Sequence, residues 1–237
     1  MEPADTTGGI TETHKAGDES AFLRYPTFAI EQQLLEEGVS LIAGVDEVGR
    51  GALAGPLCVG LVIYEASLIA STAGPIPGIN DSKKLTPRKR KSSLDLIRAA
   101  ALHASSILVS HRTVDRLNIN GATEFALNRL IGGIPLKPDI IILDGNFSFQ
   151  LPVPVRSILK GDAKSISIAS ASIVAKVHRD AIMERFDGIY PGYHFASNKG
   201  YGTGNHLAAL AARGLSPIHR RSYEPARSMI TTGGDPQ

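Results

Sequence analysis

The sequence predicts an α/β protein in which helices flank a central β-sheet. Three short apolar runs have the length and composition of buried strands: 41–45, 57–64 and 140–143. Three longer segments space their apolar residues three and four apart, as helices do: 87–103, 122–131 and 166–181. Acidic residues follow the first and third apolar runs. Because open α/β sheets place their chemistry at strand ends, we expect a functional site at this edge.

Composition places the chain among ordinary globular proteins. Its 237 residues are 43% hydrophobic and 20% charged, enough for one substantial core. No apolar run approaches the ~18 residues that cross a bilayer, and the start lacks a secretory pattern. The single cysteine, Cys58, lies within an apolar run, which excludes a disulfide framework and a thiolate metal site within one chain. We therefore expect a cytoplasmic protein without membrane association.

The net charge of +2 hides an uneven distribution. Residues 1–20 contain five acids and one base, so the remaining chain carries a net charge of +6. This acidic extension is rich in Gly and Thr and lacks an apolar period, which predicts a disordered tail. We expect one catalytic domain over 21–224 and a flexible tail over 225–237. The basic body favours a polyanionic partner, although neutral-substrate enzymes can be equally basic.

The first strand leads directly to the most unusual stretch of the chain. A short helix with apolar residues from Ala29 to Leu35 precedes it, and Asp46 and Glu47 follow it. Gly49-Arg50-Gly51 comes next, before the 57–64 strand, which pairs with the first. Carboxylates are costly beside packed apolar strands unless a cation or hydrogen-bond donors meet them. The alternative is a polar hairpin with a surface charge pair.

A basic cluster follows a loop at 74–78 that contains two prolines and two glycines. Thr86 and Pro87 form a helix start, and the helix is predicted to run to about His103. Six bases lie within nine residues: Lys83, Lys84 and Arg88–Lys91. They either form a solvated helix face or contact a phosphate backbone, and their density favours the second interpretation.

The middle of the chain repeats the arrangement of an apolar strand that ends in an acid. A strand at 106–110 and helices at 113–117 and 122–131 are predicted before Ile140–Leu143, which ends at Asp144. Asp162 then precedes the long 166–181 helix, where it could equally be a helix-start residue that favours the N-terminal dipole.

Four charged residues of the long helix remain ambiguous from sequence. Asp180 and Glu184 are most simply read as a solvated face. Lys176 and Arg179 either balance these acids or face a polyanion.

A glycine-spaced segment at 198–206 contains Tyr201 and several hydrogen-bond donors. Glycines let the backbone approach a ligand closely, and Tyr201 could stack on a sugar or base, whereas the alternative is a mobile loop. A final helix is predicted at 207–213.

Other motifs fail on spacing or context. The run from Gly49 to Gly55 nearly matches a dinucleotide fingerprint, but it is one residue too long and a strand follows where a helix is required. Lys164-Ser165 lacks the glycines of a P-loop, and the histidines show no metal spacing. No nucleophilic Cys-His or Gly-x-Ser-x-Gly arrangement appears.

The remaining constellation consists of Asp46, Glu47, Asp144 and Asp162. Four converging carboxylates repel one another, and hard cations such as Mg²⁺ remove this repulsion. Two such ions can clamp the attacking water and the leaving oxygen of a phosphodiester. Successive strand residues point to opposite faces, however, so either the strand bends at Asp46-Glu47 or one residue acts partly through its carbonyl.

Six motifs in this order resemble those of bacterial ribonuclease HII: Asp46-Glu-Val-Gly-Arg-Gly51, Asn80-Asp-Ser-Lys-Lys-Leu85, Leu143-Asp-Gly145, Lys160-Gly-Asp162, Ala169–Val177 with Arg179-Asp180, and Asn198-Lys-Gly-Tyr-Gly-Thr203. The resemblance covers roughly residues 41–224. It implies a ribonuclease-H-like fold with a central mixed sheet and a helical C-terminal part. It also implies endonucleolytic cleavage of RNA embedded in a duplex with DNA, leaving 5′-phosphate and 3′-hydroxyl ends.

The resemblance also assigns roles to residues. Asp46, Glu47, Asp144 and Asp162 are expected to hold Mg²⁺ or Mn²⁺, two ions in the catalytic state. Gly49-Arg50-Gly51 is expected to read the 2′-hydroxyl at an RNA–DNA junction, a group that distinguishes RNA from DNA. Tyr201 is expected to pack on the adjoining deoxyribose, and Ser82, Lys83 and Lys84 to lie along the substrate.

Three rival functions stay open at this point. A non-catalytic hybrid-binding module would keep the basic surface without needing the four acids. A nucleotide-dependent oxidoreductase would use the Gly49–Gly55 segment, and another ribonuclease-H-like nuclease would take a different substrate. The acidic extension lies outside the family core. The chain after Glu224 shows no obvious clamp-binding motif, so coupling to replication is left open; we expect a monomer.

Overall fold

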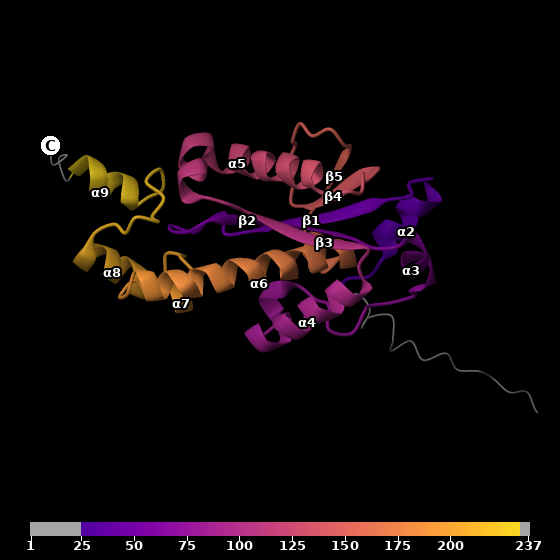
Figure 1. Cartoon of the computed structure of the whole chain (residues 1–237), viewed down its shortest axis with the longest axis horizontal. Helices are drawn as coiled ribbons and strands as arrows, with labels where there is room; N and C mark the ends of the chain where they lie inside the picture. Colours follow the sequence, from indigo (N-terminus) through magenta and orange to yellow (C-terminus); the bar gives the residue numbers. More distant parts are fainter. Residues whose placement is uncertain (1–24, 233–237) are drawn as a thin grey trace, which may run out of the picture.

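The computed structural model describes residues 25–232, and its centre is a five-stranded mixed sheet (Figure 1). The strand order is β3-β2-β1-β4-β5. β1 pairs antiparallel with β2, and β2 pairs antiparallel with β3, whereas β4 lies parallel to both β1 and β5. The strands span Ile42–Val48, Leu57–Ile63, His103–Val109, Ile140–Asp144 and Val155–Ile158 in numerical order. The extension at 1–20 and residues 233–237 lie outside the described residues.

Helices cover both faces of the sheet, so that the molecule has three layers (Figure 1). The helices along the body are α2 (Ala29–Glu36), α3 (Ala66–Ser71), α4 (Pro87–Ala100), α5 (His111–Gly133) and α6 (Ile166–Ile189). Alternate strand residues face the two layers, as the pleat requires. Ala43 and Val45 pack in the core beneath α5, whereas Ile42 packs with Ile168 of α6. This alternation decides which acidic side chains can meet.

Helix α6 lies unusually close to the sheet because glycines face it. A Cβ added to Gly60 of β2 would lie 2.2 Å from the Ala171 carbonyl oxygen. A Cβ on Gly44 of β1 would lie 2.4 Å from the Ser167 Cβ. Backbone can therefore approach backbone, and α6 carries small residues on this side. The close approach brings side chains of α6 to the end of β1.

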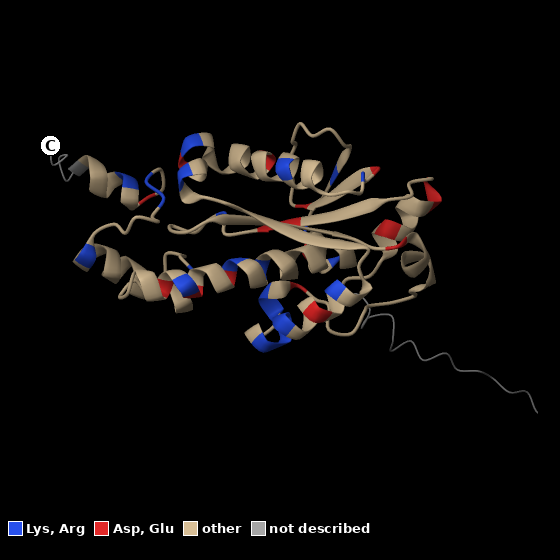
Figure 2. Ribbon diagram, viewed as in Figure 1, with Lys and Arg blue, Asp and Glu red and all other residues tan. Residues whose placement is uncertain are grey.

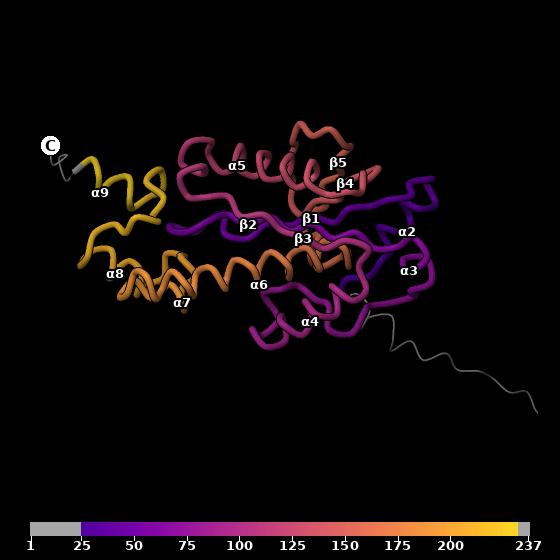
Figure 3. The backbone as a smooth tube through the Cα atoms, viewed as in Figure 1, coloured from indigo at the N-terminus to yellow at the C-terminus, as the bar shows by residue number. Residues whose placement is uncertain are grey.

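The C-terminal part is helical, as expected, and gathers at the end of the sheet opposite α2 and α3 (Figures 1 and 3). It contains α7 (Phe195–Asn198), α8 (Gly204–Arg213) and α9 (Ala226–Thr232). Helix α9 lies in the stretch for which the sequence predicts a flexible tail, and its Ala226 is buried. Within the part of the chain that the structure describes, no helix is both long and apolar enough to span a bilayer.

Several element boundaries differ from the sequence prediction. α4 ends at Ala100, and the next strand already begins at His103, because His103–Val109 pairs along the whole of β2. The two helices predicted at 113–117 and 122–131 both lie within α5, and the non-helical backbone of Asn118 (φ 54°, ψ 178°) separates them as predicted. Sequence analysis missed β5, whose edge position gives it a half-buried, weakly apolar pattern.

Candidate active site

Three carboxylates converge where the parallel strands end. Asp46 is near the end of β1, Asp144 is the last residue of β4, and Asp162 lies in a short 3₁₀ turn (Gly161–Ala163) before α6. One oxygen from each carboxylate lies within 4.8 Å of the other two. Asp46 lies four residues after Ile42 on β1, and Asp144 lies two residues after Ile142 on β4. Ile42 and Ile142 both pack with Ile168 of α6, so the two aspartate side chains project toward α6 as well. The Gly161 N–H donates to Asp144 Oδ1 at 2.6 Å and ties the turn to β4.

Glu47, the fourth predicted acid, lies beside this group and not within it. β1 continues through Asp46 and Glu47 without interruption, paired with Gly60 and Val59. The strand therefore does not break here, and Glu47 stays outside the group of three, although it lines the same cavity as Asp46. Its Oε1 lies 3.5 Å from Arg50 Nε. Its Oε2 is buried and has no hydrogen-bond partner among the described residues.

The electrostatics of the group favour a bound cation. Burial, and then the charge of Glu47, raise the pKa of Asp46 well above its ordinary value, although a hydrogen bond from Ser172 opposes this. Burial raises the pKa of Glu47 to about 7, with Arg50 acting in the opposite direction. Burial and the charge of Asp162 raise the pKa of Asp144. Burial and mutual repulsion thus oppose the simultaneous ionisation of these carboxylates. A hard divalent ion bound between their oxygens would remove that repulsion.

The loop after β1 borders the carboxylates with backbone rather than with a free arginine. The Arg50 side chain bonds Thr123 Oγ1 at 3.0 Å and Asn120 Oδ1 at 2.7 Å, both on α5. Its guanidinium also lies 4.4 Å from the ring centroid of Phe147. Gly51, in contrast, is exposed and has open space around its Cα. The backbone at Gly51 is thus the accessible part of this loop.

A small cavity of about 180 Å³ lies between two of the acids, the loop after β1 and Tyr201. Asp46, Glu47, Gly51, Lys83 and Tyr201 all line it, although they come from three separate segments. The Arg179 guanidinium lies 5.4 Å from the Tyr201 ring centroid and supports that ring from α6. The structure therefore brings together most of the side chains that the sequence analysis selected.

The basic residues divide into two sets. Lys83 Nζ lies 3.1 Å from Asp162 Oδ2 at the mouth of the site. Partial burial acts against its charge, but Asp162 and other acids raise the pKa of Lys83 on balance. Ser82 is buried and shares a 2.9 Å hydrogen bond with Ser172, so its hydroxyl supports the site from behind.

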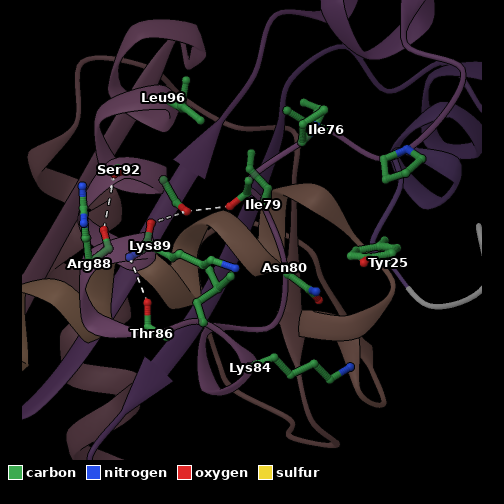
Figure 4. Close-up of a pocket in the computed structure, with 15 residues that line it drawn as sticks. Tyr25, Ile76, Ile79, Asn80, Lys84, Thr86, Arg88, Lys89, Ser92 and Leu96 are labelled. Carbon is green, nitrogen blue, oxygen red and sulfur yellow. Dashed lines mark hydrogen bonds between the residues drawn. The ribbon is translucent and has the colours of Figure 1, made fainter.

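Lys84 lines a different and larger groove, of about 910 Å³, beside α4 (Figure 4). Arg88 and Lys89 share this groove, and their charges gather at the start of α4 (Figures 2 and 4). None of the four acids lines it. Tyr25, Ile76 and Leu96 add apolar surface to its wall (Figure 4). The groove is thus a basic surface lined by none of the four acids, and it is not the chemical centre.

Arg90 and Asp180 do not occupy the places that the sequence predicts, and Arg179 takes neither of the two places that the sequence leaves open. Arg90 turns inward, where it donates to the carbonyls of Ser82 and Leu85 and lies 3.6 Å from Asp180. Asp180 is consequently buried, and it also pairs with Lys176 at 2.8 Å. The prediction of a solvated Asp180 is therefore wrong. Arg179 is fully buried and faces carbonyls, so it does not face a polyanion.

Sequence reasoning missed residues that hold the site from beneath. Ser172 lies beside Asp46, and Arg220 and Tyr223 bond the backbone of the loop after β1. The Ala-Ser-Ala-Ser repeat on α6 carried a signal for Ser172, because small polar residues recur where a helix meets a sheet closely. The adjacent arginines at 220 and 221 gave no indication that one is fully buried.

Comparisons with known proteins agree with this geometry. The family model for ribonuclease HII matches residues 43–226. Ribonuclease HII from Geobacter sulfurreducens is 44% identical over 200 residues, which are 84% of this chain and 89% of that protein. The ribonuclease H2 structure from Pyrococcus horikoshii has a TM-score of 0.65 at 26% identity, covering 81% of this chain and 98% of that one.

A further similar structure is the complex of PCNA with ribonuclease HII from Archaeoglobus fulgidus. Its matching chain has a TM-score of 0.64 at 25% identity and covers 78% of this chain and 95% of that one. The mixed sheet flanked by helices is thus the ribonuclease-H-like fold that the motifs imply. Sequence, fold and clustered carboxylates agree: the chain belongs to the ribonuclease HII family, and this membership implies endoribonuclease H activity.

Proposed function

We propose that the chain cleaves the RNA strand of RNA·DNA hybrids and single ribonucleotides in duplex DNA, leaving 5′-phosphate and 3′-hydroxyl ends. We further propose that Asp46, Glu47, Asp144 and Asp162 hold the two divalent ions, Mg²⁺ or Mn²⁺. One observation carries this proposal: three carboxylates have oxygens within 4.8 Å of one another, and one of them, Asp46, lines the same cavity as Gly51 and Tyr201. A pure binding surface would gain nothing from acids beside phosphates.

The bound ions would supply charge neutralisation and orientation at the scissile phosphate. The protein residues divide the remaining work. Asp46 is held by β1 and Ser172, and Asp144 by the Gly161 N–H, so both carboxylates are fixed before substrate arrives. The buried Oε2 of Glu47 is available as a further oxygen ligand. This fixed arrangement reduces the reorganisation that the reaction requires.

Substrate recognition uses the other wall of the cavity. We assign the Gly51 backbone N–H to the 2′-hydroxyl, because the Arg50 side chain is engaged by α5 and Glu47. Tyr201 offers its ring to the neighbouring deoxyribose. Lys83, which pairs with Asp162 in this structure, would contact a phosphate, and Lys84, Arg88 and Lys89 would follow the duplex backbone along the α4 groove.

We also propose that the protein acts as a monomer in the cytoplasm. The three clustered aspartates and the residues that line the cavity all lie in a single chain, so the proposed site requires no residue of a second copy. The single cysteine is buried, and burial raises its pKa to about 12, which suits a protein without disulfide chemistry.

The test is cleavage of a labelled DNA duplex that contains one ribonucleotide, with Mg²⁺, Mn²⁺ or EDTA. An Asp144→Asn variant is the control, because it keeps the shape of the side chain and removes its charge. We expect a cut on the 5′ side of the ribonucleotide that is lost in EDTA and in the variant. Cleavage of long hybrids alone would contradict the role of Gly51. Tight hybrid binding without cleavage would indicate a binding module.

A further inference from the structure

The loop Gly49–Pro56 is anchored from beneath by a buried arginine of the C-terminal part. Arg220 is 0% exposed, and its guanidinium donates to the Arg50 carbonyl at 2.8 Å and to the Gly55 carbonyl at 3.2 Å. The backbone N–H of Arg220 also donates to the Leu53 carbonyl at 2.8 Å. Among the described residues it has no ion pair with a carboxylate. Its guanidinium hydrogen bonds are therefore made to this loop.

Tyr223 reinforces the same point of attachment. Its hydroxyl donates to the Arg50 carbonyl at 2.8 Å, so that this one oxygen accepts from two side chains. The Arg220 guanidinium lies 5.1 Å from the Tyr223 ring centroid, which makes the two residues a single packed unit. Hydrogen bonds to charged donors are stronger than neutral ones, and this carbonyl is accordingly held in one direction.

Fixing the Arg50 carbonyl also fixes the next N–H. The Arg50–Gly51 peptide is trans, so its C=O and N–H point in opposite directions. With the carbonyl held against Arg220 and Tyr223, the Gly51 N–H is directed away from them. Gly51 is exposed and borders the cavity, and no hydrogen bond from its N–H is formed within the described part of the chain. That N–H is thus oriented and available for a ligand acceptor.

We propose that Arg220 and Tyr223 are positioning residues for ribonucleotide recognition: by holding the Arg50 carbonyl, they aim the Gly51 N–H at the sugar 2′-hydroxyl. This inference rests on the proposed function, because it assumes that Gly51 contacts the ribose. A hydrogen bond to the 2′-oxygen depends on direction as well as distance. Releasing the carbonyl therefore weakens the preference for ribose over deoxyribose more than it weakens contact with phosphates.

The test compares two affinities of each protein in EDTA at one fixed salt concentration, measured by fluorescence anisotropy. One duplex contains a single ribonucleotide and the other is DNA of the same sequence. Tyr223→Phe removes one of the two hydrogen bonds to the Arg50 carbonyl. Tyr193→Phe is the matched control, since it removes a tyrosine bond to a backbone carbonyl, that of Gly214 at 3.0 Å, outside the loop. Arg220→Lys is the second test variant.

We expect the ribonucleotide preference to fall about fivefold in Tyr223→Phe, the effect of one net hydrogen bond. Arg220→Lys should lower it by about tenfold or more, because the charged, multiply bonded anchor is lost. The affinity of every variant for the plain DNA duplex should stay within about twofold of the wild-type value. The ribonucleotide preference of Tyr193→Phe should also stay within about twofold of the wild-type preference.

The outcomes separate the two proposals. A wild-type protein without any ribonucleotide preference would contradict the assigned role of Gly51, and the positioning role with it. A wild-type preference that Tyr223→Phe and Arg220→Lys both retain would overturn the positioning role alone. Thermal unfolding of each variant identifies any general loss of structure. A fall in Tyr193→Phe equal to that in Tyr223→Phe would likewise overturn the inference, since it would indicate a nonspecific structural effect.

Discussion

The two glycines that flank Arg50 should respond in opposite ways to the same added methyl group. Gly49 is buried and has φ +94°, and a Cβ placed there would lie 2.2 Å from Arg179 Nε. The left-handed backbone costs an alanine about 1–2 kcal/mol, and displacing a packed side chain costs about 1–3 kcal/mol more. Gly49→Ala should therefore lower the free energy of unfolding by about 2–5 kcal/mol.

Gly51 has no such conflict, because nothing lies within 4 Å of an added Cβ and its φ is not in the left-handed region. Gly51→Ala should change the free energy of unfolding by less than about 0.5 kcal/mol. Gly51 nevertheless borders the cavity where the ribose is proposed to bind, so an added methyl group would take space from the ribose. We expect cleavage at a single ribonucleotide to fall at least about tenfold, the effect of about 1.4 kcal/mol.

Urea unfolding of both variants, together with single-turnover cleavage, measures these two effects separately. Equal destabilisation of the two variants would refute the assignment of Gly49 to structure and Gly51 to recognition. A stable Gly51→Ala variant with wild-type cleavage would refute the recognition role by itself.

Three further predictions address metal binding, packing and pH. Asp46→Asn should raise the melting temperature in EDTA by about 2–4 °C, because a neutral group replaces a buried carboxylate with a raised pKa. The variant should also show a smaller increase in melting temperature when Mg²⁺ is added, and a thermal melt in each buffer measures both effects. Gly60→Ala should lower the free energy of unfolding by about 1–3 kcal/mol, since its Cβ would meet the Ala171 carbonyl. Gly132→Ala, on the open surface of α5, should instead raise the free energy of unfolding by up to about 1 kcal/mol. Urea titration of both variants measures these changes. Burial, and then the charge of His206, lower the pKa of His219 to about 4. As the pH falls, His219 therefore binds its proton in the unfolded chain before it does so in the folded one. The free energy of unfolding should fall by about 2–3 kcal/mol between pH 6.5 and pH 4, and His219→Gln should reduce this dependence on pH.

Much of the fold and site could be predicted because the relevant signals are local. Apolar strands, the Thr86-Pro87 helix start and the acids after two strands are each contained within a few residues. Thr86 accepts from the Lys89 N–H as an N-cap should. The prediction that Asp46 and Asp144 would meet follows from the rule that parallel strand ends share one edge, and β1 and β4 are indeed parallel neighbours.

What could not be predicted depends on contacts between distant residues. Arg90 belongs to a dense basic run, and its own segment does not indicate that Asp180 is buried opposite it. Arg179 and Arg220 look like surface cations, yet both are buried because carbonyls of the 54–56 turn accept from them. The separation of Glu47 from the three aspartates could be anticipated as a stereochemical difficulty, but the direction of each side chain required the sheet.

The glycine-mediated contact between the sheet and α6 also has a consequence for the chain during its synthesis. β1 and β2 are complete at Ile63, whereas the helix that covers their second face begins at Ile166. At a ribosomal rate of about 5–20 residues per second, roughly 5–20 s pass before α6 begins to emerge. The apolar face of the nascent sheet lacks its native cover during this interval. Chaperone capture, or slower folding of nascent chains that end before residue 189, should therefore be most pronounced over this part of translation.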